Sequence, residues 1–240
     1  MQVTTPDTIE WLNVLLYGAP GAGKTHLSGT AQDHKMTAPV LLLDVEGGTV
    51  TLRNRPDIDV IQVRSTRQVA EIHKSLYEEN NGYYRTVVVD SLTELQKLDM
   101  RDIMREVVQK RPDLDEDVPS MREWGKSGEH MRRIVRAFRD LPMNTIFTAL
   151  VQLQQDEIGT VSFQPSLPGK LRTEIPGFLD IVGYLYTEPN GDKLERVLQF
   201  ASTKKVVAKD RTSSLGDRLE NPTIPVMWAM IHNEKGEAKK

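Results

Sequence analysis

The chain contains no cysteine and no long apolar run, and each absence excludes a class of protein. Without cysteine there are no disulfides to hold together an exported, disulfide-dependent fold. No apolar run approaches the roughly 20 residues that a membrane-spanning helix needs. A formal net charge of -3 also argues against a protein that coats nucleic acid through a generally basic surface. Any contact with DNA is therefore expected to be confined to particular loops.

The composition that remains is that of a soluble globular protein. Hydrophobic residues make up 38% of the chain and charged residues 27%. A length of 240 residues suffices for one large α/β domain. We predict one domain over residues 1–232 and a disordered tail at 233–240. The first residues, MQVTTPDTIEWLN, lack a basic segment followed by an apolar one, so we expect a cytoplasmic protein with no membrane partner.

Strand and helix signals alternate along most of the chain. Short apolar runs rich in β-branched residues and leucine are typical of strands buried on both faces of a parallel sheet. Apolar residues at helical spacing, on otherwise charged segments, predict helices between them. This alternation predicts a doubly wound α/β fold whose ligands bind at the carboxyl ends of the strands. The predicted strands of this part are 14–18, 40–46, 59–63, 86–90 and 145–150, and the helical stripes are Met100, Ile103, Met104 and Val107, followed by Met131, Ile134, Val135, Phe138 and Leu141.

The pattern changes after residue 150. Segments 181–188, 196–202 and 205–210 have strand composition and are separated by short loops such as PNGD. Short connections favour antiparallel pairing. We therefore predict an antiparallel extension of the same sheet.

The strongest chemical signal is GAPGAGKT at residues 18–25, which follows a predicted strand and precedes a helix. It fits the P-loop pattern, in which glycines let successive backbone N–H groups turn toward one phosphate. In that pattern Lys24 reaches the β- and γ-phosphates of a nucleotide and the Thr25 hydroxyl ligates Mg²⁺. A plain glycine-rich turn would leave Lys24 and Thr25 unexplained. The predicted nucleotide-binding residues here are Gly18, Ala19, Pro20, Gly21, Ala22, Gly23, Lys24, Thr25 and the adjacent His26.

Two further strand ends carry acids. The run TVVVD ends at Asp90, where a carboxylate in a P-loop sheet holds Mg²⁺ together with Thr25. The run LLLDVEGG carries Asp44 and Glu46 at alternating positions, so both side chains are expected on one side of the strand end. NTP hydrolysis needs a base close to the γ-phosphate, and Glu46 lies nearer the strand tip. The alternative is a solvated acidic turn.

GAPGAGKT, LLLDVEGG and VVVDS, in this order and spacing, resemble the RecA-like core ATPases, over roughly residues 12–215. The closest resemblance is to compact bacteriophage members that act as recombinases or single-strand annealing proteins beside a single-stranded DNA-binding protein. The resemblance implies ATP and Mg²⁺ as cofactors, Glu46 as catalytic base and Asp90 as the second acid. It also implies a γ-phosphate-sensing glutamine on the next strand. Gln152 is the candidate, although strict alignment places Leu150 there.

The same resemblance implies two DNA-contacting loops. The candidates are residues 109–128 and 153–176, both long and turn-rich. The second is favoured, because Phe163 could stack on a base while Lys170 and Arg172 neutralise phosphates. The acidic run DLDED argues against DNA contact in the first. For either segment the alternative is an ordinary surface loop.

Lys209 and Arg211 form a late Lys-x-Arg pair at a strand tip. RecA-like ATPases commonly hydrolyse ATP between subunits, and several branches supply such a pair to the neighbouring site. Residues two apart on a strand share a face, so both cations can point at one phosphate while Asp210 faces away. The resemblance thus implies a trans-acting catalytic finger in a homo-oligomeric ring or filament. A charged turn or a DNA phosphate contact are the alternatives.

Taken together, these features predict an ATP-hydrolysing phage protein of DNA recombination that binds and anneals single-stranded DNA or exchanges strands. The main alternative is a nucleotide-gated adaptor or loader in DNA replication or packaging, with little turnover of its own. A small-molecule P-loop kinase fits less well, because the D-x-E-G-G element and the late Lys-x-Arg pair are not expected of one.

Overall fold

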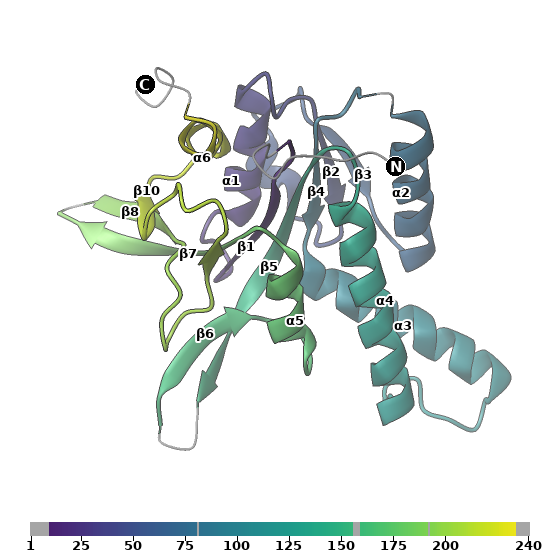
Figure 1. Ribbon diagram of the computed structural model, residues 1–240. Coiled ribbons are helices and arrows are strands. Elements are labelled where there is room, and N and C mark those ends of the chain that lie inside the picture. The colour runs from purple at the N-terminus through teal and green to yellow at the C-terminus, as the bar shows by residue number, and fades with distance from the viewer. Residues whose placement is uncertain (1–9, 81, 156–158, 192, 234–240) are drawn as a thin grey trace, which may run out of the picture.

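A computed structural model describes residues 10–80, 82–155, 159–191 and 193–233. Its centre is a mixed β-sheet with helices on both faces (Figure 1). The strands run in the spatial order β10-β8-β7-β1-β5-β4-β2-β3, with β6 added to β5 and β9 added to β7. They are β1 (Asn13–Gly18), β2 (Val40–Asp44), β3 (Asp59–Gln62), β4 (Thr86–Asp90), β5 (Asn144–Gln155), β6 (Val161–Pro165), β7 (Ile181–Asn190), β8 (Lys193–Gln199), β9 (Lys209–Asp210) and β10 (Arg218–Glu220).

The strands from β3 to β7 are parallel neighbours, and the later strands are not. Pairs β2·β3, β2·β4, β4·β5, β1·β5 and β1·β7 are all parallel. Strands β8, β9 and β10 add antiparallel pairs at the β7 side. This arrangement confirms the predicted α/β class with an antiparallel C-terminal extension. Strand β7 pairs antiparallel with β8 and β9, as predicted, but it joins the rest of the sheet as a parallel neighbour of β1, because α5 lies between β6 and β7 in the chain.

Helices cover both faces of the sheet and separate two apolar cores. Along β1, Leu15 and Tyr17 enter the core beneath α2, α3, α4 and α5, whereas Val14 and Leu16 enter the core beneath α1 and α6. The near-continuous apolar strands follow from this two-sided burial. The helices are α1 (Lys24–Gly29), α2 (Thr66–Glu79), α3 (Leu92–Lys110), α4 (Met121–Arg139), α5 (Leu171–Phe178) and α6 (Ile224–Ile231), with short 3₁₀ turns η1 (Thr30–Asp33) and η2 (Thr49–Leu52).

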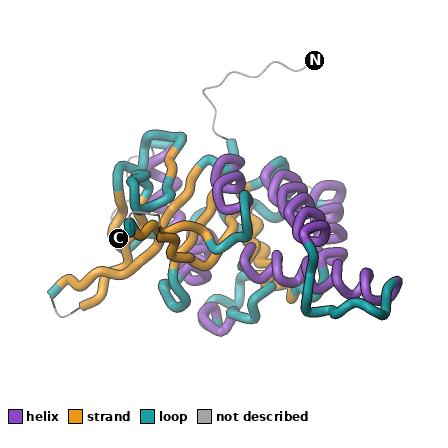
Figure 2. Tube along the Cα trace, turned by 90° about the horizontal axis from the view of Figure 1, so that it is seen from below, coloured by secondary structure: helices purple, strands orange, loops and turns teal. Residues whose placement is uncertain are grey.

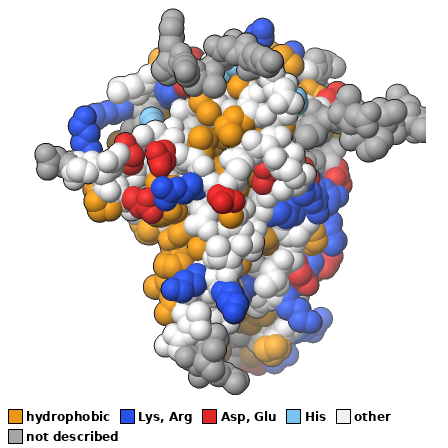
Figure 3. Space-filling view, turned by 60° about the vertical axis from the view of Figure 1, so that its left-hand side comes forward, with side chains coloured by type: hydrophobic (Ala, Val, Ile, Leu, Met, Phe, Trp, Pro, Cys, Tyr) orange, Lys and Arg blue, Asp and Glu red, His pale blue; other side chains and the backbone are white. Residues whose placement is uncertain are grey.

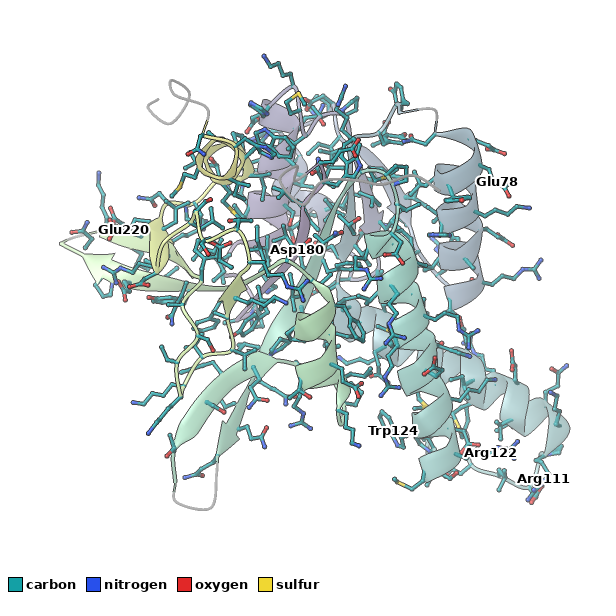
Figure 4. The ribbon with its side chains drawn as sticks, in the orientation of Figure 1. Glu78, Arg111, Arg122, Trp124, Asp180 and Glu220 are labelled. Carbon is teal, nitrogen blue, oxygen red and sulfur yellow. The ribbon has the colours of Figure 1, made fainter. Side chains whose placement is uncertain are left out.

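Helices α3 and α4 form a hairpin that extends from the body of the molecule (Figure 1). Its first predicted stripe is buried at Met100, Ile103 and Met104, which confirms a core-facing helix. The predicted loop at 109–128 was too long, because α3 continues to Lys110 and α4 already begins at Met121. The Ser120–Glu123 capping box starts α4 by satisfying backbone N–H groups at its first turn. Figure 4 shows Arg111, Arg122 and Trp124 at the far end of this hairpin.

The predicted loop at 153–176 is largely ordered secondary structure. Strand β5 continues to Gln155 and pairs with β6, while α5 begins at Leu171. The apolar run alone did not indicate that β5 continues to Gln155. The residues of β5 beyond Gln152 are exposed, and Leu153 is the one apolar residue among them. Only backbone pairing with β6 holds them extended. Residues 156–158, at the tip of this hairpin, lie outside the described residues.

The C-terminal strands form the side of the molecule that faces the viewer in Figure 3. Hairpin β7–β8 projects outward in both Figure 1 and Figure 2. Acidic and basic side chains lie close together on part of this side (Figure 3). Arg218 forms ion pairs with Glu188 and Glu220, both at 3.3 Å. The strand predicted at 205–210 is reduced to β9, because only its last two residues pair with β7.

No helix within the described ranges is long and apolar enough to cross a bilayer. The tail predicted at 233–240 lies outside the described residues except for Asn233.

Candidate nucleotide-binding site

The P-loop follows directly from the carboxyl end of β1, in the middle of the sheet. Gly18 is packed so closely against β7 that a Cβ there would lie 2.2 Å from the carbonyl oxygen of Leu185. Gly21 and Gly23 have φ values of +76° and +101°, a region that side-chain-bearing residues rarely adopt. Gly18 is therefore required by the close approach of the β7 backbone, and Gly21 and Gly23 by their left-handed backbone conformations.

Lys24 is folded over the loop that precedes it. Its Nζ donates hydrogen bonds of 3.0 Å to the carbonyl oxygens of Gly18 and Ala19, and the residue is buried. Burial lowers the pKa of Lys24, while the carboxylates of Glu46 and Asp90 oppose that shift. The ammonium group thus interacts electrostatically with Glu46 and Asp90, the two acids that the sequence predicts at this site.

Thr25 and Asp90 meet although they lie on different elements. The Thr25 hydroxyl donates a 2.6 Å hydrogen bond to Asp90 Oδ2. Asp90 Oδ1 accepts a hydrogen bond from the Thr148 hydroxyl on β5, and both Asp90 and Thr148 are buried. Sequence reasoning missed Thr148, whose one signal is a polar residue inside an apolar strand. Thr148 fixes the orientation of the Asp90 carboxylate.

Asp44 and Glu46 occupy different environments, contrary to the prediction that they share one side of a strand end. Strand β2 ends at Asp44 itself, whose side chain is 3% exposed. Its Oδ1 accepts hydrogen bonds from the backbone N–H groups of Gly47 and Gly48, and its Oδ2 accepts one from Gln62. These bonds turn the chain before the strand can continue. Both carboxylate oxygens of Asp44 are thus occupied by hydrogen bonds in and around the turn, whereas the side chain of Glu46 is exposed.

Gln152 lies on β5, beyond the position that is level with the P-loop. Leu150 pairs with Gly18 across β1 and β5, and Gln152 pairs with Gln164 in the β5–β6 hairpin. Because residues alternate along a strand, Thr148, Leu150 and Gln152 share a face of β5. Gln152 is half-buried, and among the described residues no hydrogen bond joins its side chain to residues 18–25.

His26 is exposed on the first turn of α1, and a second residue that sequence reasoning missed lies beside it. Burial, Arg196 and Arg55 together lower the pKa of His26. Arg196 lies on β8, and its Nε would stand 2.6 Å from a Cβ placed on Gly23. Nothing in the sequence indicates this approach, since it arises from the packing of the β7–β8 hairpin beside β1.

Lys209 and Arg211 share a face of the chain, while Asp210 faces another way, as predicted. Lys209 Nζ donates to the carbonyl oxygens of Pro176 and Gly177 at 2.8 and 3.4 Å. Arg211 donates to Gly177 O at 3.0 Å and to Asp180 Oδ1 at 3.1 Å. Within one chain the two cations therefore satisfy the carboxyl end of α5, where helix carbonyls lack intrahelical partners.

The position of this pair separates it from its own P-loop. Lys209 pairs with Val182 on β7, whereas Gly18 is level with Leu185. Three strand residues correspond to about 10 Å. Figure 4 shows Asp180, the partner of Arg211, near the middle of the molecule. In the described residues neither cation forms a hydrogen bond or ion pair with residues 18–25.

The candidate DNA contacts are held in different ways. Phe163 on β6 is half-buried and stacks on Tyr184, with ring centroids 5.2 Å apart. Arg172 donates to Gly169 O at 2.9 Å and Gln154 Oε1 at 3.0 Å. Lys170, at the start of α5, is exposed. Of these three side chains, Lys170 alone is freely presented to solvent.

The donor set fits a magnesium nucleotide. Gly21 has open space where a Cβ would stand, so the tip of the loop is free of side chains. The Thr25 hydroxyl and the Asp90 carboxylate supply adjacent oxygen ligands of the kind that Mg²⁺ prefers. The buried Lys24 ammonium supplies a cation for phosphate.

The mostly parallel sheet and the P-loop at the end of its central strand β1 define an α/β domain of the P-loop type. The family model described as "AAA domain" matches residues 11–212, so the chain belongs to that family. No curated protein matches this sequence.

Two solved archaeal structures are similar to the chain at low identity. One is a KaiC-like protein, PH0186, from Pyrococcus horikoshii OT3, with 13% identity, a TM-score of 0.45 and coverage of 81% of this chain and 80% of that chain. The other is the flagellar accessory protein FlaH from Methanocaldococcus jannaschii, with 12% identity, a TM-score of 0.43 and coverage of 79% and 78%.

Proposed function

We propose that residues 1–232 act as one Mg²⁺-dependent ATPase domain. The observation that carries the proposal is the contact of Thr25 with Asp90 beside a buried Lys24 whose pKa is influenced by Glu46. A cation, a hydroxyl, a buried carboxylate and an exposed carboxylate thereby surround one glycine-rich loop. This is the set of groups that phosphoryl transfer to water requires.

Each residue has a distinct role in the proposed reaction. Lys24 leaves the carbonyl oxygens of Gly18 and Ala19 and binds the β- and γ-phosphates, which offer it charged acceptors in place of neutral ones. Thr25 and Asp90 hold Mg²⁺, which when bound neutralises charge on the phosphate oxygens. Glu46, whose side chain is exposed and takes no part in the hydrogen bonds of the turn, accepts a proton from the attacking water. Gln152 remains our candidate for sensing the γ-phosphate.

We propose that hydrolysis depends on self-association into a ring or filament. Lys209 and Arg211 lie on the side of β7 away from residues 18–25 in their own chain, which supports a role in a neighbour's site. A guanidinium supplied in trans stabilises charge that develops on the γ-phosphoryl group and contributes about 10³ to 10⁵ in rate in comparable enzymes. To act in this way Arg211 must exchange Asp180 for phosphate.

We further propose that single-stranded DNA binds this ATPase and regulates its rate of hydrolysis. A basic groove of about 620 Å³ supports the proposal and lies beside the loop that carries Glu46. Its charged members are Arg64, Glu94, Lys97, Arg101 and Arg105. Lys97 is paired with Glu94 and Arg105 with Glu116, but in the described residues Arg64 and Arg101 have no carboxylate partner. Unpaired guanidinium groups at this edge suit a phosphate backbone.

The earlier candidates complement this groove. Lys170 remains our proposed phosphate contact on the α5 side, with Arg172 and Phe163 available only if they leave their present partners. Given the motif resemblance to phage recombination ATPases, we propose that DNA binding serves annealing or strand exchange in the host cytoplasm, beside a single-stranded DNA-binding protein.

The test is a steady-state ATPase assay with Mg²⁺, across a range of protein concentrations, with and without single-stranded DNA. We expect the rate per chain to rise with concentration and with DNA, and Lys24→Ala to be inactive. Arg64→Ala combined with Arg101→Ala should reduce the stimulation by DNA and leave the basal rate unchanged. Arg67→Ala, which removes an exposed arginine paired with Glu71, is the control. A wild-type rate independent of both concentration and DNA would contradict assembly and DNA regulation together.

The alternative is a nucleotide-gated adaptor or loader. The side chain of Glu46 is exposed and has no hydrogen-bond partner among the described residues, so it is free to act as a base. This favours an ATP-hydrolysing enzyme over the adaptor. Wild-type protein that binds ATP but never hydrolyses it, even with DNA present, would support the adaptor.

A further inference from the structure

Arg196 fills the space above the last glycine of the P-loop. Its Nε, Cδ and Cζ would lie 2.6, 3.2 and 3.4 Å from a Cβ built on Gly23. This side chain comes from β8, far along the chain, and crosses β7 to reach the loop after β1. A β8 arginine therefore lies against the backbone of the phosphate-binding loop.

The guanidinium has no carboxylate partner within the described ranges. Arg218, on the strand next to β8, is paired with Glu188 and Glu220, whereas the Arg196 side chain forms no hydrogen bond or ion pair with the residues that the structure describes. The charge of Arg196 acts instead on His26, whose pKa it helps to lower. An unpaired cation thus faces the loop that the proposed function assigns to phosphate.

The strand order decides which part of a nucleotide Arg196 would meet. Asp90 on β4 and Glu46 after β2 lie on the β5 side of β1, whereas Arg196 lies on the β7 side. Asp90 and Glu46 mark the γ-phosphate and its attacking water in the proposed function. The opposite flank faces the nucleoside end of the triphosphate.

We propose that Arg196 is a positioning residue that binds the α-phosphate of the bound nucleotide in cis. The inference rests on nucleotide binding at the P-loop and adds to it a contact that is independent of the γ-phosphate. A guanidinium can donate two parallel hydrogen bonds to phosphate oxygens, which fixes orientation as well as affinity. Because the Arg196 carbonyl accepts a 2.7 Å hydrogen bond from Asn221 N, the contact also ties a bound nucleotide to the C-terminal strands.

The test compares the affinities of ADP and ATP, measured by equilibrium binding of fluorescent analogues with Mg²⁺ in the Glu46→Gln background, which prevents turnover. Arg196→Ala should weaken ADP and ATP by the same factor, about tenfold for the loss of a charge-assisted contact. Arg196→Lys should recover part of that affinity, because the charge is kept and the paired donors are lost. Lys193→Ala, an exposed cation on the same strand, should change neither affinity.

With Glu46 intact, Arg196→Ala should raise KM for ATP and leave kcat nearly unchanged. Its melting temperature without nucleotide should match that of the wild type, because the side chain is exposed and has no hydrogen-bond or ion-pair partner among the described residues. Unchanged affinity for both nucleotides would overturn the proposal, and so would a loss confined to ATP, which would place Arg196 at the γ-phosphate. Wild-type protein that binds neither nucleotide would instead overturn the proposed function.

Discussion

The Thr25 hydroxyl lies 2.6 Å from the Asp90 carboxylate, and this contact joins the start of α1 to the end of β4. Two segments far apart in the chain meet there because β1 and β4 flank β5 in the sheet. The carboxyl ends of parallel neighbours lie at one edge, so a hydroxyl after the first strand and an acid ending the other come together.

The first prediction concerns Thr148, which orients Asp90 from β5. Thr148→Val removes the hydroxyl that donates to Asp90 and keeps the shape of the side chain. The Mg²⁺ concentration for half-maximal ATPase should rise by about tenfold, as is usual when a partner of a metal ligand is removed. Magnesium titrations of the ATPase rate measure this change.

Thr145→Val is the matched control on the same strand. Its buried hydroxyl donates to the Phe138 carbonyl oxygen at 3.0 Å, away from the site. Both variants should lose about 1 kcal/mol of stability, with the magnesium requirement altered only in Thr148→Val. Equal magnesium requirements in the two variants would reduce Thr148 to a packing residue.

The second prediction separates the two acids after β2. Glu46→Gln should lower turnover by at least about 10²-fold and retain ATP binding, because a general base is lost without a change of shape. Asp44→Ala should lower the free energy of unfolding by about 1–3 kcal/mol, since the Gly47 and Gly48 amides and Gln62 lose their acceptor. Urea denaturation and ATPase rates together distinguish them. Normal turnover in Glu46→Gln would remove Glu46 from the catalytic step.

The third prediction tests the trans role of Arg211. Arg211→Ala should bind ATP nearly as well as the wild type, but turnover should fall by about 10³-fold. Mixing it with Glu46→Gln subunits, whose Arg211 is intact, should restore activity, because each Arg211→Ala site then has an intact neighbour. The readout is the ATPase rate as a function of mixing ratio.

Asp180→Ala provides the comparison for a purely structural role. It removes the ion pair with Arg211 but leaves the guanidinium in place. Loss of this half-exposed pair should cost no more than about 1 kcal/mol. If Asp180→Ala is as inactive as Arg211→Ala, and mixing rescues neither, Arg211 serves only to hold the end of α5.

The fourth prediction follows from the pKa of Lys24. Burial lowers that pKa below its ordinary 10.5, so the folded protein releases the proton at a lower pH than the unfolded chain. The unfolded state therefore binds more protons between the lowered pKa and 10.5, and the free energy of unfolding gains a contribution that rises with pH in that window. Lys24→Met should remove this contribution.

The measurement is chemical denaturation of the protein without nucleotide at several alkaline pH values. Lys74→Met, which alters an exposed lysine on α2, is the control, because its charge is screened by solvent. The free energy of unfolding is plotted against pH, and the slope for Lys24→Met is compared with that for the wild type. Other groups that titrate at alkaline pH do so in both proteins, so the difference in slope reports on Lys24. Parallel curves for the two proteins would show that Lys24 is not held in a desolvated position.

Several features of the fold could be predicted from the amino-acid sequence. Apolar runs rich in β-branched residues predicted β1 and β4 closely, because strands buried on both faces need apolar residues throughout. The run at 59–63 also predicted β3, although β3 is the edge strand of the sheet and most of its residues are exposed. The helical stripe that includes Met131, Val135 and Phe138 predicted α4 for a similar reason. The order of the motifs likewise predicted that Lys24, Thr25 and Asp90 would meet at the carboxyl edge of the sheet.

Other features depended on contacts that no local pattern contains. Strand β5 extends to Gln155 because β6 pairs with it, and β2 stops at Asp44 because that side chain binds the amides of the following turn. Burial and hydrogen bonding therefore hold Asp44 in the turn, whereas the catalytic role of Glu46 stays a prediction.

The sequence alone determined that a P-loop would stand at the end of a buried parallel strand, because residue type and spacing suffice for both. Tertiary structure alone decided that Thr148 holds Asp90, that Lys209 and Arg211 bind the end of α5, and that Arg196 lies over Gly23. These are contacts between segments separated in sequence. Their partners are selected by the order of strands in the sheet, which brings together side chains whose proximity the linear chain does not reveal.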